Sequence, residues 1–241
     1  MSVIADIDRT RAVALAARAE AIMARELLAE MIRREFPGRI ALVSSFGIEA
    51  AVLLHMISTI DPGTPVVFLD TGKLFGETLR YRDELVRRLC LGDVRSVRPD
   101  TDRLVVEDPE GTLWRSDPDK CCALRKVEPL ERALAGFDAW INGRKRHHGG
   151  ARAALPVIET AGGRIKVNPL ASWGPGEIEA YFAANDLPRH PLEADGYRSV
   201  GCVPCSDRAK AGEGARDGRW RGRDKTECGI HVSVASTPRD E

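Results

Sequence analysis

Short, mostly apolar runs alternate along this chain with longer stretches of helical periodicity. The runs expected to form strands are residues 40–43, 66–69, 94–97 and 139–141, and the first two are expected to be buried. Residues 48–60, 74–90 and 121–135 between them carry apolar side chains at helical spacing. Strands that alternate with helices pair in parallel, and the connecting helices cover the sheet. The alternation therefore predicts an α/β fold, a mostly parallel sheet with helices on both faces.

Two segments lie outside this alternation. Residues 1–37 are predicted to form one helical segment that ends at Pro37-Gly38. Residues 188–241 are rich in Gly, Pro, Arg and Asp and have little hydrophobic periodicity, which predicts irregular structure. We therefore expect an N-terminal helical segment at 1–37, a main domain at 38–206 and a mobile tail at 207–241.

Composition limits the classes of function. The 241 residues include 36 basic and 36 acidic side chains, which argues against a general nucleic-acid partner. No apolar run is long enough to span a membrane, and residues 1–10 have no signal-peptide pattern. A cytoplasmic location with reduced thiols is the resulting expectation. Positive charge is nevertheless concentrated locally, because residues 143–152 hold four basic residues and no acidic one. That distribution suits a small anionic ligand.

Two loops follow predicted strands and form a candidate nucleotide site. Ser44-Ser45-Phe46-Gly47 joins a strand to a helix, where amides, serine hydroxyls and a helix N-terminus favour an anion. The same residues also fit a serine cap without a ligand. Leu69-Asp70-Thr71-Gly72 ends the next strand. If the two strands are parallel neighbours, both loops lie at the sheet edge where α/β proteins bind nucleotides.

Four of the six cysteines form two pairs, Cys121-Cys122 and Cys202-x-x-Cys205. Four thiolates suit tetrahedral zinc or an iron–sulfur cluster, whereas one CxxC alone also fits a redox dithiol. Adjacent cysteines cannot easily turn both thiolates toward one small ion, while a cubane offers a separate iron to each. The pattern therefore favours a 4Fe-4S cluster.

The other two cysteines have different surroundings. Cys228 follows several basic residues near the C-terminus, and nearby cations favour a nucleophilic thiolate. Alone, it equally fits a tail cysteine without a role. Cys90 is predicted to be a small buried hydrophobe near a helix end.

Taken together, these motifs resemble a known family. The two loops, Leu74–Thr78, Cys121-Cys122, Gly201–Cys205 and Glu227–His231 are similar to the assimilatory adenylyl-sulfate reductases of the adenylyl-sulfate/phosphoadenylyl-sulfate reductase family. The resemblance covers residues 38–232. It implies an adenine nucleotide alpha-hydrolase-like fold of the PP-loop type and a 4Fe-4S cluster on the four paired cysteines. It also implies reduction of adenosine 5′-phosphosulfate to sulfite and AMP for cysteine biosynthesis.

The resemblance assigns roles to individual residues. Cys228 attacks sulfur to form an S-sulfocysteine, and thioredoxin or a glutaredoxin-like reductant releases sulfite. Lys126 lies near cluster and sulfate, and Arg216, Arg219 and His231 hold the sulfate. The residues implied to bind nucleotide are Ser44, Ser45, Phe46, Gly47, Leu69, Asp70, Thr71, Gly72, Gly143, Lys145, Arg146 and Arg152. Family members form homo-oligomers.

This chain departs from the family pattern in the basic loop. Lys145 stands where an arginine is usual, and His148-Gly149 replace Gln-Ser. Lysine cannot reproduce the bidentate arginine fork, so the mode of nucleotide recognition stays open. Adjacent imidazoles at His147-His148 fit solvated or anion-contacting side chains better than a metal site.

Alternatives remain for the function. Phosphoadenylyl sulfate, or both nucleotides, fits the same motifs. A non-catalytic iron–sulfur nucleotide sensor is a second class, against which the intact Cys228 motif argues. A zinc protein with ATP-dependent thiolation chemistry is a third, although the first loop lacks the SGGxDS form of such enzymes.

Overall fold

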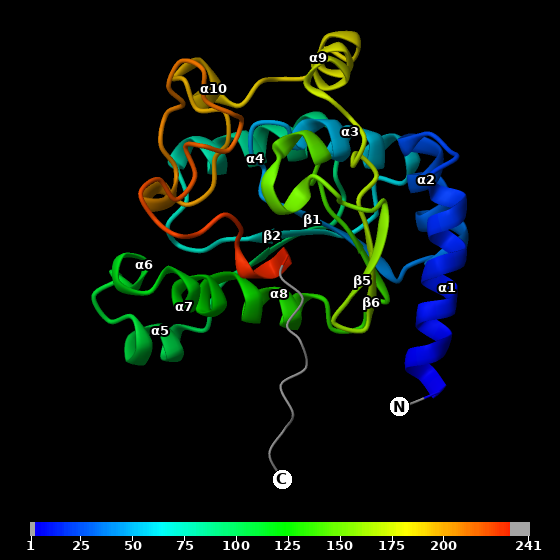
Figure 1. Cartoon of the computed structure of the whole chain (residues 1–241), viewed down its shortest axis with the longest axis horizontal. Coiled ribbons are helices and arrows are strands. Elements are labelled where there is room, and N and C mark those ends of the chain that lie inside the picture. Colours follow the sequence, from blue (N-terminus) through cyan, green and yellow to red (C-terminus); the bar gives the residue numbers. More distant parts are fainter. Residues whose placement is uncertain (1–2, 232–241) are drawn as a thin grey trace.

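A six-stranded sheet in the order β3-β2-β1-β4-β6-β5 forms the centre of the molecule (Figure 1). The structure is a computed structural model that describes residues 3–231, with side chains from residue 10 onward. The strands are β1 (Ile40–Ser44), β2 (Val66–Leu69), β3 (Val94–Val97), β4 (Ala139–Ile141), β5 (Ile158–Ala161) and β6 (Arg164–Val167). All neighbours pair in parallel except β5, which is antiparallel to β6. The predicted mostly parallel α/β fold is confirmed.

The central strand β1 sets the position of the site. All five of its residues are buried, as expected of a parallel strand covered on both faces. Leu42 lies opposite Val66 of β2 on one side and Ile141 of β4 on the other. The chain therefore moves outward from β1 through β2 to β3, and then returns to form β4 on the other side of β1. This topological switch point, between β1 and β4, is where open α/β sheets bind ligands.

Helices cover both faces of the sheet, as the sequence predicts. Helices α3 (Ala50–Ile60), α4 (Gly76–Arg88) and α9 (Pro175–Ala184) contribute to the larger core on one face. Helix α8 (Glu128–Ala133) packs Leu130 on the other face, against Val43, Val67 and Trp140. Figure 1 shows α3, α4 and α9 above the sheet and α8 below it. The two apolar layers fix the loops that leave the strands between them.

The N-terminal segment differs from its prediction as one helix. It divides into α1 (Val3–Ala19), α2 (Ala24–Glu30) and a π-helical turn, η1 (Met31–Glu35). The break lets α1 lie along the edge strand β5, whereas α2 packs on α3. Leu15 of α1 and Leu27 of α2 are both buried in the main core. Tertiary packing therefore determines the break, which residue periodicity alone does not reveal.

Several elements were not predicted. The hairpin β5–β6 turns at Gly162-Gly163, both with positive φ, and adds the antiparallel edge. Helices α5 (Thr101–Glu107) and α6 (Leu113–Ser116) follow β3 along the chain. The helix predicted at 121–135 begins earlier, as α7 (Pro118–Cys122), because Asp117 caps it and Pro118 suits its first turn. It continues through a π-helical turn, η2 (Ala123–Val127), into α8.

The chain from residue 188 to residue 231 is mostly irregular, as expected. It contains α10 (Pro191–Ala194) and the 3₁₀ turns η5 (Val203–Cys205) and η6 (Gly229–His231). Figure 1 shows this segment returning across the sheet edge, so that η6 lies near α8. Residues 232–241 of the predicted tail lie outside the described residues.

The prediction that Cys90 is buried was wrong, because Cys90 is exposed. It follows the end of α4, where the Leu91 amide donates to the Val86 carbonyl at 3.1 Å. This helix ending places Cys90 in the left-handed region, at φ +51°, and directs Leu91 inward instead.

Candidate active site

A cavity of about 220 Å³ opens at the carboxyl ends of β1, β2 and β4, at the switch point. Because β1 and β2 are parallel neighbours, their loops share this edge, as anticipated. The predicted site residues that line the cavity are Ser44, Ser45, Gly47, Leu69, Thr71, Lys126, Gly143, Lys145, Arg152, Arg216, Arg219, Cys228 and His231. Segments far apart in the sequence thus meet around one space.

Three predicted residues of the first two loops lie outside the cavity lining. Phe46 is fully buried at φ +48°, with its ring edge-on to Phe68 of the core. Asp70 is buried, accepts the Gly72 amide at 3.1 Å and pairs with Arg98 at 2.9 Å. These contacts shape the loops. Their predicted roles in nucleotide binding remain predictions.

The basic loop after β4 is folded by its own cations. It contains the 3₁₀ turns η3 (Arg146–His148) and η4 (Gly150–Arg152). Arg146, which is outside the cavity lining, donates to the Leu155 carbonyl at 2.8 Å. Arg144 is buried and pairs with Glu159 of β5. The unpredicted hairpin therefore supplies the carboxylate that holds the loop in place.

Two carboxylates bind cations in the cavity wall. Lys145 is almost fully buried, and its Nζ donates to Glu49 Oε2 at 2.6 Å. Arg152 is buried and makes two hydrogen bonds to Glu227, one of them 2.8 Å long. Arg216 also approaches Glu227, at 3.4 Å. Since Glu227 directly precedes Cys228, this ion-pair cluster ties the cysteine's segment to the basic loop.

The C-terminal segment is attached to the CxxC turn by backbone and side-chain contacts. The Arg219 Nε donates to the Cys205 carbonyl at 2.9 Å, and Arg219 also lies over the Trp220 ring at 4.6 Å. Gly201 leaves room for this side chain, because a Cβ at that position would displace the Arg219 guanidinium. Cys228 packs against the cluster formed by Cys202, Cys205 and Trp220. The predicted nucleophile and two of the predicted metal ligands are therefore neighbours.

The four paired cysteines come together between α7 and η5. All four are buried, and they line one small space beside the main cavity. Tetrahedral zinc would bring its sulfur atoms within roughly 4 Å of one another, from Zn–S bonds of about 2.3 Å. Among the described residues, no three of these sulfurs lie within 4.8 Å of one another. This spacing suits a cluster that offers a separate iron to each thiolate better than it suits one small ion.

These buried thiols need a positive partner in order to ionise. Burial raises the pKa of Cys121 to about 11, and the neighbouring Cys122 adds to this effect. Burial likewise raises the pKa values of Cys122 and Cys205. Metal coordination is the usual way to hold buried thiolates ionised. The donor set therefore fits an iron–sulfur cluster.

Lys126 stands between the thiols and the cavity. It follows Cys122 by one helical turn, within η2, and lines both spaces. Burial opposes its charge, but Cys202, Cys228 and Cys122 outweigh burial and raise its pKa above the usual range. Lys126 is therefore a fixed cation that faces thiols.

His231 is a neutral group in the cavity wall. Its ring stacks on Trp140 of β4 at 6.0 Å between ring centres. Burial, followed by the charge of Lys166, lowers its pKa well below 6.5. Within residues 3–231 its Nδ1 finds no hydrogen-bond partner. Buried polar atoms are usually paired, so this nitrogen is a candidate ligand contact.

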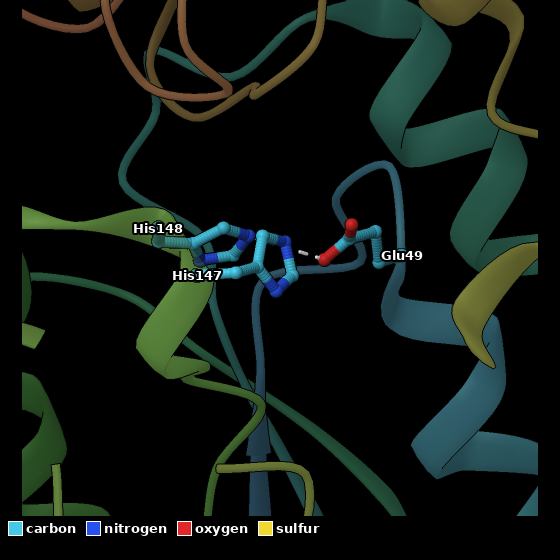
Figure 2. A group of neighbouring side chains, drawn as sticks. All are labelled: Glu49, His147 and His148. Carbon is cyan, nitrogen blue, oxygen red and sulfur yellow. Dashed lines mark ion pairs between the residues drawn. The ribbon is translucent and has the colours of Figure 1, made fainter. Parts of the chain in front are cut away.

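Glu49, His147 and His148 form the group that could geometrically hold a metal ion (Figure 2). The Arg152 Nη1 lies 3.1 Å from His148 Nδ1, and a guanidinium only donates. His148 Nδ1 must therefore accept, so its Nε2 carries the proton and lies 3.4 Å from Glu49 Oε2. With Lys145 on the same oxygen, two donors already occupy the place of a cation. The sequence interpretation that disfavoured a metal here stays a prediction.

Sequence reasoning missed the acidic residues of this site. Glu49 follows the first loop by two positions, and Glu227 lies inside the Glu227–His231 motif. Their signal was the excess of local positive charge, since buried cations need carboxylates nearby. Glu159, on the unpredicted β5, gave no such signal.

Comparison with known proteins places this cavity in context. Residues 39–208 match the phosphoadenosine phosphosulfate reductase domain. An adenosine 5′-phosphosulfate reductase from Chelativorans sp. is 51% identical over 214 residues, covering 89% of this chain and 86% of that relative. A phosphoadenosine 5′-phosphosulfate reductase from Gloeobacter violaceus is 39% identical over 235 residues, covering 94% and 95%.

Solved structures agree with the fold. The crystal structure of a phosphoadenylyl-sulfate reductase from Candida auris is 27% identical, with a TM-score of 0.68 over 80% of this chain and 94% of that one. An FMN adenylyltransferase from Candida glabrata shares the fold, at 15% identity and a TM-score of 0.54 over 93% and 86%. The expected nucleotide alpha-hydrolase-like fold is confirmed. The chain belongs to the phosphoadenosine phosphosulfate reductase family.

Proposed function

We propose that this protein reduces adenosine 5′-phosphosulfate to sulfite and AMP, by way of an S-sulfocysteine on Cys228, in sulfate assimilation. The observation that carries the proposal is the position of Cys228, in the wall of a cation-lined cavity and beside the four-cysteine group. Most of the relatives compared are named adenosine 5′-phosphosulfate reductase, which supports this choice of substrate.

The reaction needs one nucleophile and an external reductant. The Cys228 thiolate attacks the sulfate sulfur, a sulfur–sulfur bond forms, and the bond from sulfur to the bridging phosphate oxygen breaks. AMP leaves with that electron pair. A thiolate of thioredoxin, or of a glutaredoxin-like dithiol, then attacks Cys228 Sγ and expels sulfite. The second thiol of the reductant resolves the mixed disulfide, so the dithiol is oxidised as sulfur is reduced by two electrons.

Cations of the cavity stabilise the charge that this substitution moves. Lys126 and Arg219 face the thiols, so they act on the sulfonyl oxygens and the attacking sulfur. Arg152 lies beside Glu227, close to Cys228, and binds the phosphate that becomes the leaving group, while Arg216, which also approaches Glu227, holds the sulfate. His231, in the tautomer with the proton on Nδ1, donates a hydrogen bond from that nitrogen to a sulfate oxygen.

Cys121, Cys122, Cys202 and Cys205 hold a 4Fe-4S cluster. When bound, the cluster supplies a localised charge beside Lys126 and links α7 to η5. Lys126 contacts both sides, since it lines the cysteine space and the cavity. Its task is to hold positive charge at the sulfate end of the nucleotide.

The test is sulfite release from adenosine 5′-phosphosulfate with reduced thioredoxin. The wild type should turn over, Cys228→Ser should not, and Cys90→Ser should match the wild type because Cys90 is exposed on a distant helix end. Incubation without reductant should add the mass of one sulfonate to the wild type, and a dithiol should remove it. Equal turnover by Cys228→Ser would refute the mechanism. Nucleotide binding without any adduct would favour the sensor alternative.

Phosphoadenylyl sulfate is the competing substrate, because the Gloeobacter violaceus relative is named for it. A side-by-side comparison of kcat/KM for the two nucleotides decides the question. The proposal expects the unphosphorylated 3′-hydroxyl form to be preferred.

A further inference from the structure

Lys166 is a buried cation that the proposed mechanism does not use. Its side chain is 1% exposed, and it belongs to β6, outside the lining of the cavity. Its Nζ lies 4.7 Å from the centre of the Trp140 ring and 3.4 Å from Glu159 Oε1. Lysine is seldom buried so completely unless it is well paired, and this pair is a long one.

Strand pairing connects Lys166 with the cavity wall. Trp140 of β4, Lys166 of β6 and Glu159 of β5 lie opposite one another in register. Residues paired across neighbouring strands point to the same face of a sheet, so these three side chains form one row. His231 lines the cavity and stacks on the Trp140 ring. The row therefore joins the carboxylate of the hairpin to a group in the wall.

The charges around Lys166 do not balance. Glu159 is the one carboxylate among the described side chains that pairs with Lys166, and Arg144 shares its Oε1. The other carboxylate nearby, Glu227, already pairs with two arginines. We call these groups the charge network, which consists of four cations (Arg144, Arg152, Lys166 and Arg216) and two carboxylates (Glu159 and Glu227).

Lys166 is the cation of this network that can lose its proton near neutral pH, because arginine stays protonated in proteins. Burial and the charge of Arg144 lower the pKa of Lys166 to about 7, although Cys228 and Glu227 act in the opposite direction. On the α8 side of the sheet, Glu131 pairs with Arg164 instead.

An anion in the cavity changes this balance. Arg152 and Arg216 line the cavity, and the proposed function places the phosphate and the sulfate of the nucleotide against them. A negative charge close to a basic group favours the protonated form of that group. The bound nucleotide thus supplies the negative charge that the network lacks.

We propose that Lys166 takes up a proton from solvent when the anionic nucleotide binds, and that the resulting ammonium balances the charge of the ligand. Lys166 is then a positioning residue, which acts through the charge network and touches no substrate atom. The inference rests on the proposed function for the identity of the nucleotide. Because the protonated protein binds more tightly, affinity should fall as pH rises above about 7, by at most about tenfold per pH unit.

The test is calorimetry of adenosine 5′-phosphosulfate binding in buffers of different ionisation enthalpy, which counts the protons taken up. Holoenzyme carrying Cys228→Ser is the background, because it forms no adduct and lacks the Cys228 thiol as a source of protons. Both acidic groups of this nucleotide are ionised near neutral pH, so the proton enters the protein. We expect uptake of about half a proton per nucleotide near pH 7, and almost none below roughly pH 6.

Variants assign the proton to one side chain. Lys166→Met should lose the uptake and the pH dependence of binding, while Arg144 still pairs with Glu159. Lys166→Arg carries a permanent charge, so it should bind without uptake and keep its affinity at high pH. Lys210→Met, at an exposed lysine, is the matched control and should take up protons as the background does. His231→Gln should also retain the uptake, even where it weakens binding.

The outcomes separate this inference from the proposed function. Undiminished uptake by Lys166→Met, or no uptake by the background, would overturn the inference, and loss of uptake in His231→Gln alone would assign the proton to His231 instead. Lys166→Gln repeats the measurement with a polar side chain, and melting temperatures check that each variant is folded. Uptake that depends on Lys166, in a protein whose wild type forms no sulfonate adduct and releases no sulfite, would uphold the inference and refute the proposed reaction.

Discussion

The buried ion pair between Arg125 and Asp108 should be a main support of the cysteine helix. The Arg125 guanidinium donates to Asp108 Oδ2 at 2.6 Å and to the Thr71 carbonyl at 2.9 Å. The Leu113 amide satisfies Asp108 Oδ1 at 2.8 Å. Both side chains are over 90% buried, at 8% and 2% exposure. One pair thus joins η2, next to Cys122, to the loop after β2 and to α6.

Asp108→Asn keeps the shape of the side chain and removes its charge. Breaking a buried pair from one side costs about 3–5 kcal/mol, because the guanidinium remains buried without a counter-charge. For a chain of this size each kcal/mol shifts the melting temperature by roughly 2–4 °C, so a loss of roughly 6–20 °C is expected. Thermal denaturation of the holoenzyme at one scan rate measures it. Iron content per chain should fall as well, since η2 carries on directly from the cysteine pair.

The control is Asp83→Asn, which breaks the pair of Asp83 with Arg82, where the aspartate side chain is 67% exposed. Exposed pairs contribute about 0–1 kcal/mol, so its melting temperature should fall by roughly 4 °C at most. Equal shifts in the two variants would refute the reasoning.

The pH dependence of stability gives a second check. Burial disfavours the charge of Asp108, but the hydrogen bonds from Arg125 and Leu113 keep its pKa below 3.8. The stabilisation is therefore present above that value and is lost as pH falls through the lower folded-state pKa.

Three further predictions concern the C-terminal segment. Glu227→Gln leaves Arg152 without its counter-charge and should weaken the attachment of residues 207–231 by about 1–3 kcal/mol. Protease cleavage of this segment should then rise by about 10- to 100-fold. Unchanged cleavage would show that the Arg152–Glu227 ion pair does not hold the segment in place. Burial keeps His231 neutral while residues 207–231 pack on the protein, so the same residues bind more protons when they detach. Protease cleavage of this segment should therefore rise as pH falls below 6.5, by at most about tenfold per pH unit. His231→Gln should flatten that slope, and a slope as steep as in the wild type would exclude His231 as its cause. Gly201→Ala should displace the Arg219 guanidinium from the cavity wall. We expect kcat/KM to fall by about tenfold or more, with little change in melting temperature. Full activity would show that Arg219 is dispensable.

The sequence predicted the framework of this site because the framework rests on local patterns. Buried parallel strands require continuous apolar runs, so β1, β2 and β4 could be located from the order of apolar residues along the chain. Their loops follow the strands directly, and parallel pairing then brings the loops to one edge. The cysteine pairs were equally visible, since a CxxC together with an adjacent pair of thiols is typical of metal or cluster ligands.

The partners of the site cations could not be predicted, because they depend on contacts between distant segments. Lys145 meets Glu49 from 96 positions away, and Arg152 meets Glu227 from 75. The hairpin β5–β6 holds Arg144 through Glu159. Polar residues interrupt both of its strands, so neither shows the continuous apolar run that marks β1, β2 and β4. Cys90 was misjudged for a related reason, since the backbone geometry of a helix end decides which side chain faces the core.

The departure at position 145 acquires a physical meaning from these contacts. An arginine there could place its fork on both oxygens of Glu49, since bidentate pairing is the preferred geometry of guanidinium with carboxylate. Lysine is a point donor, and Lys145 takes Oε2 together with the Gly143 carbonyl at 3.1 Å. His148, at the second departure, approaches the same oxygen. The two replacements therefore act in the same direction. They keep Glu49 ionised through two contacts that both fall on Oε2.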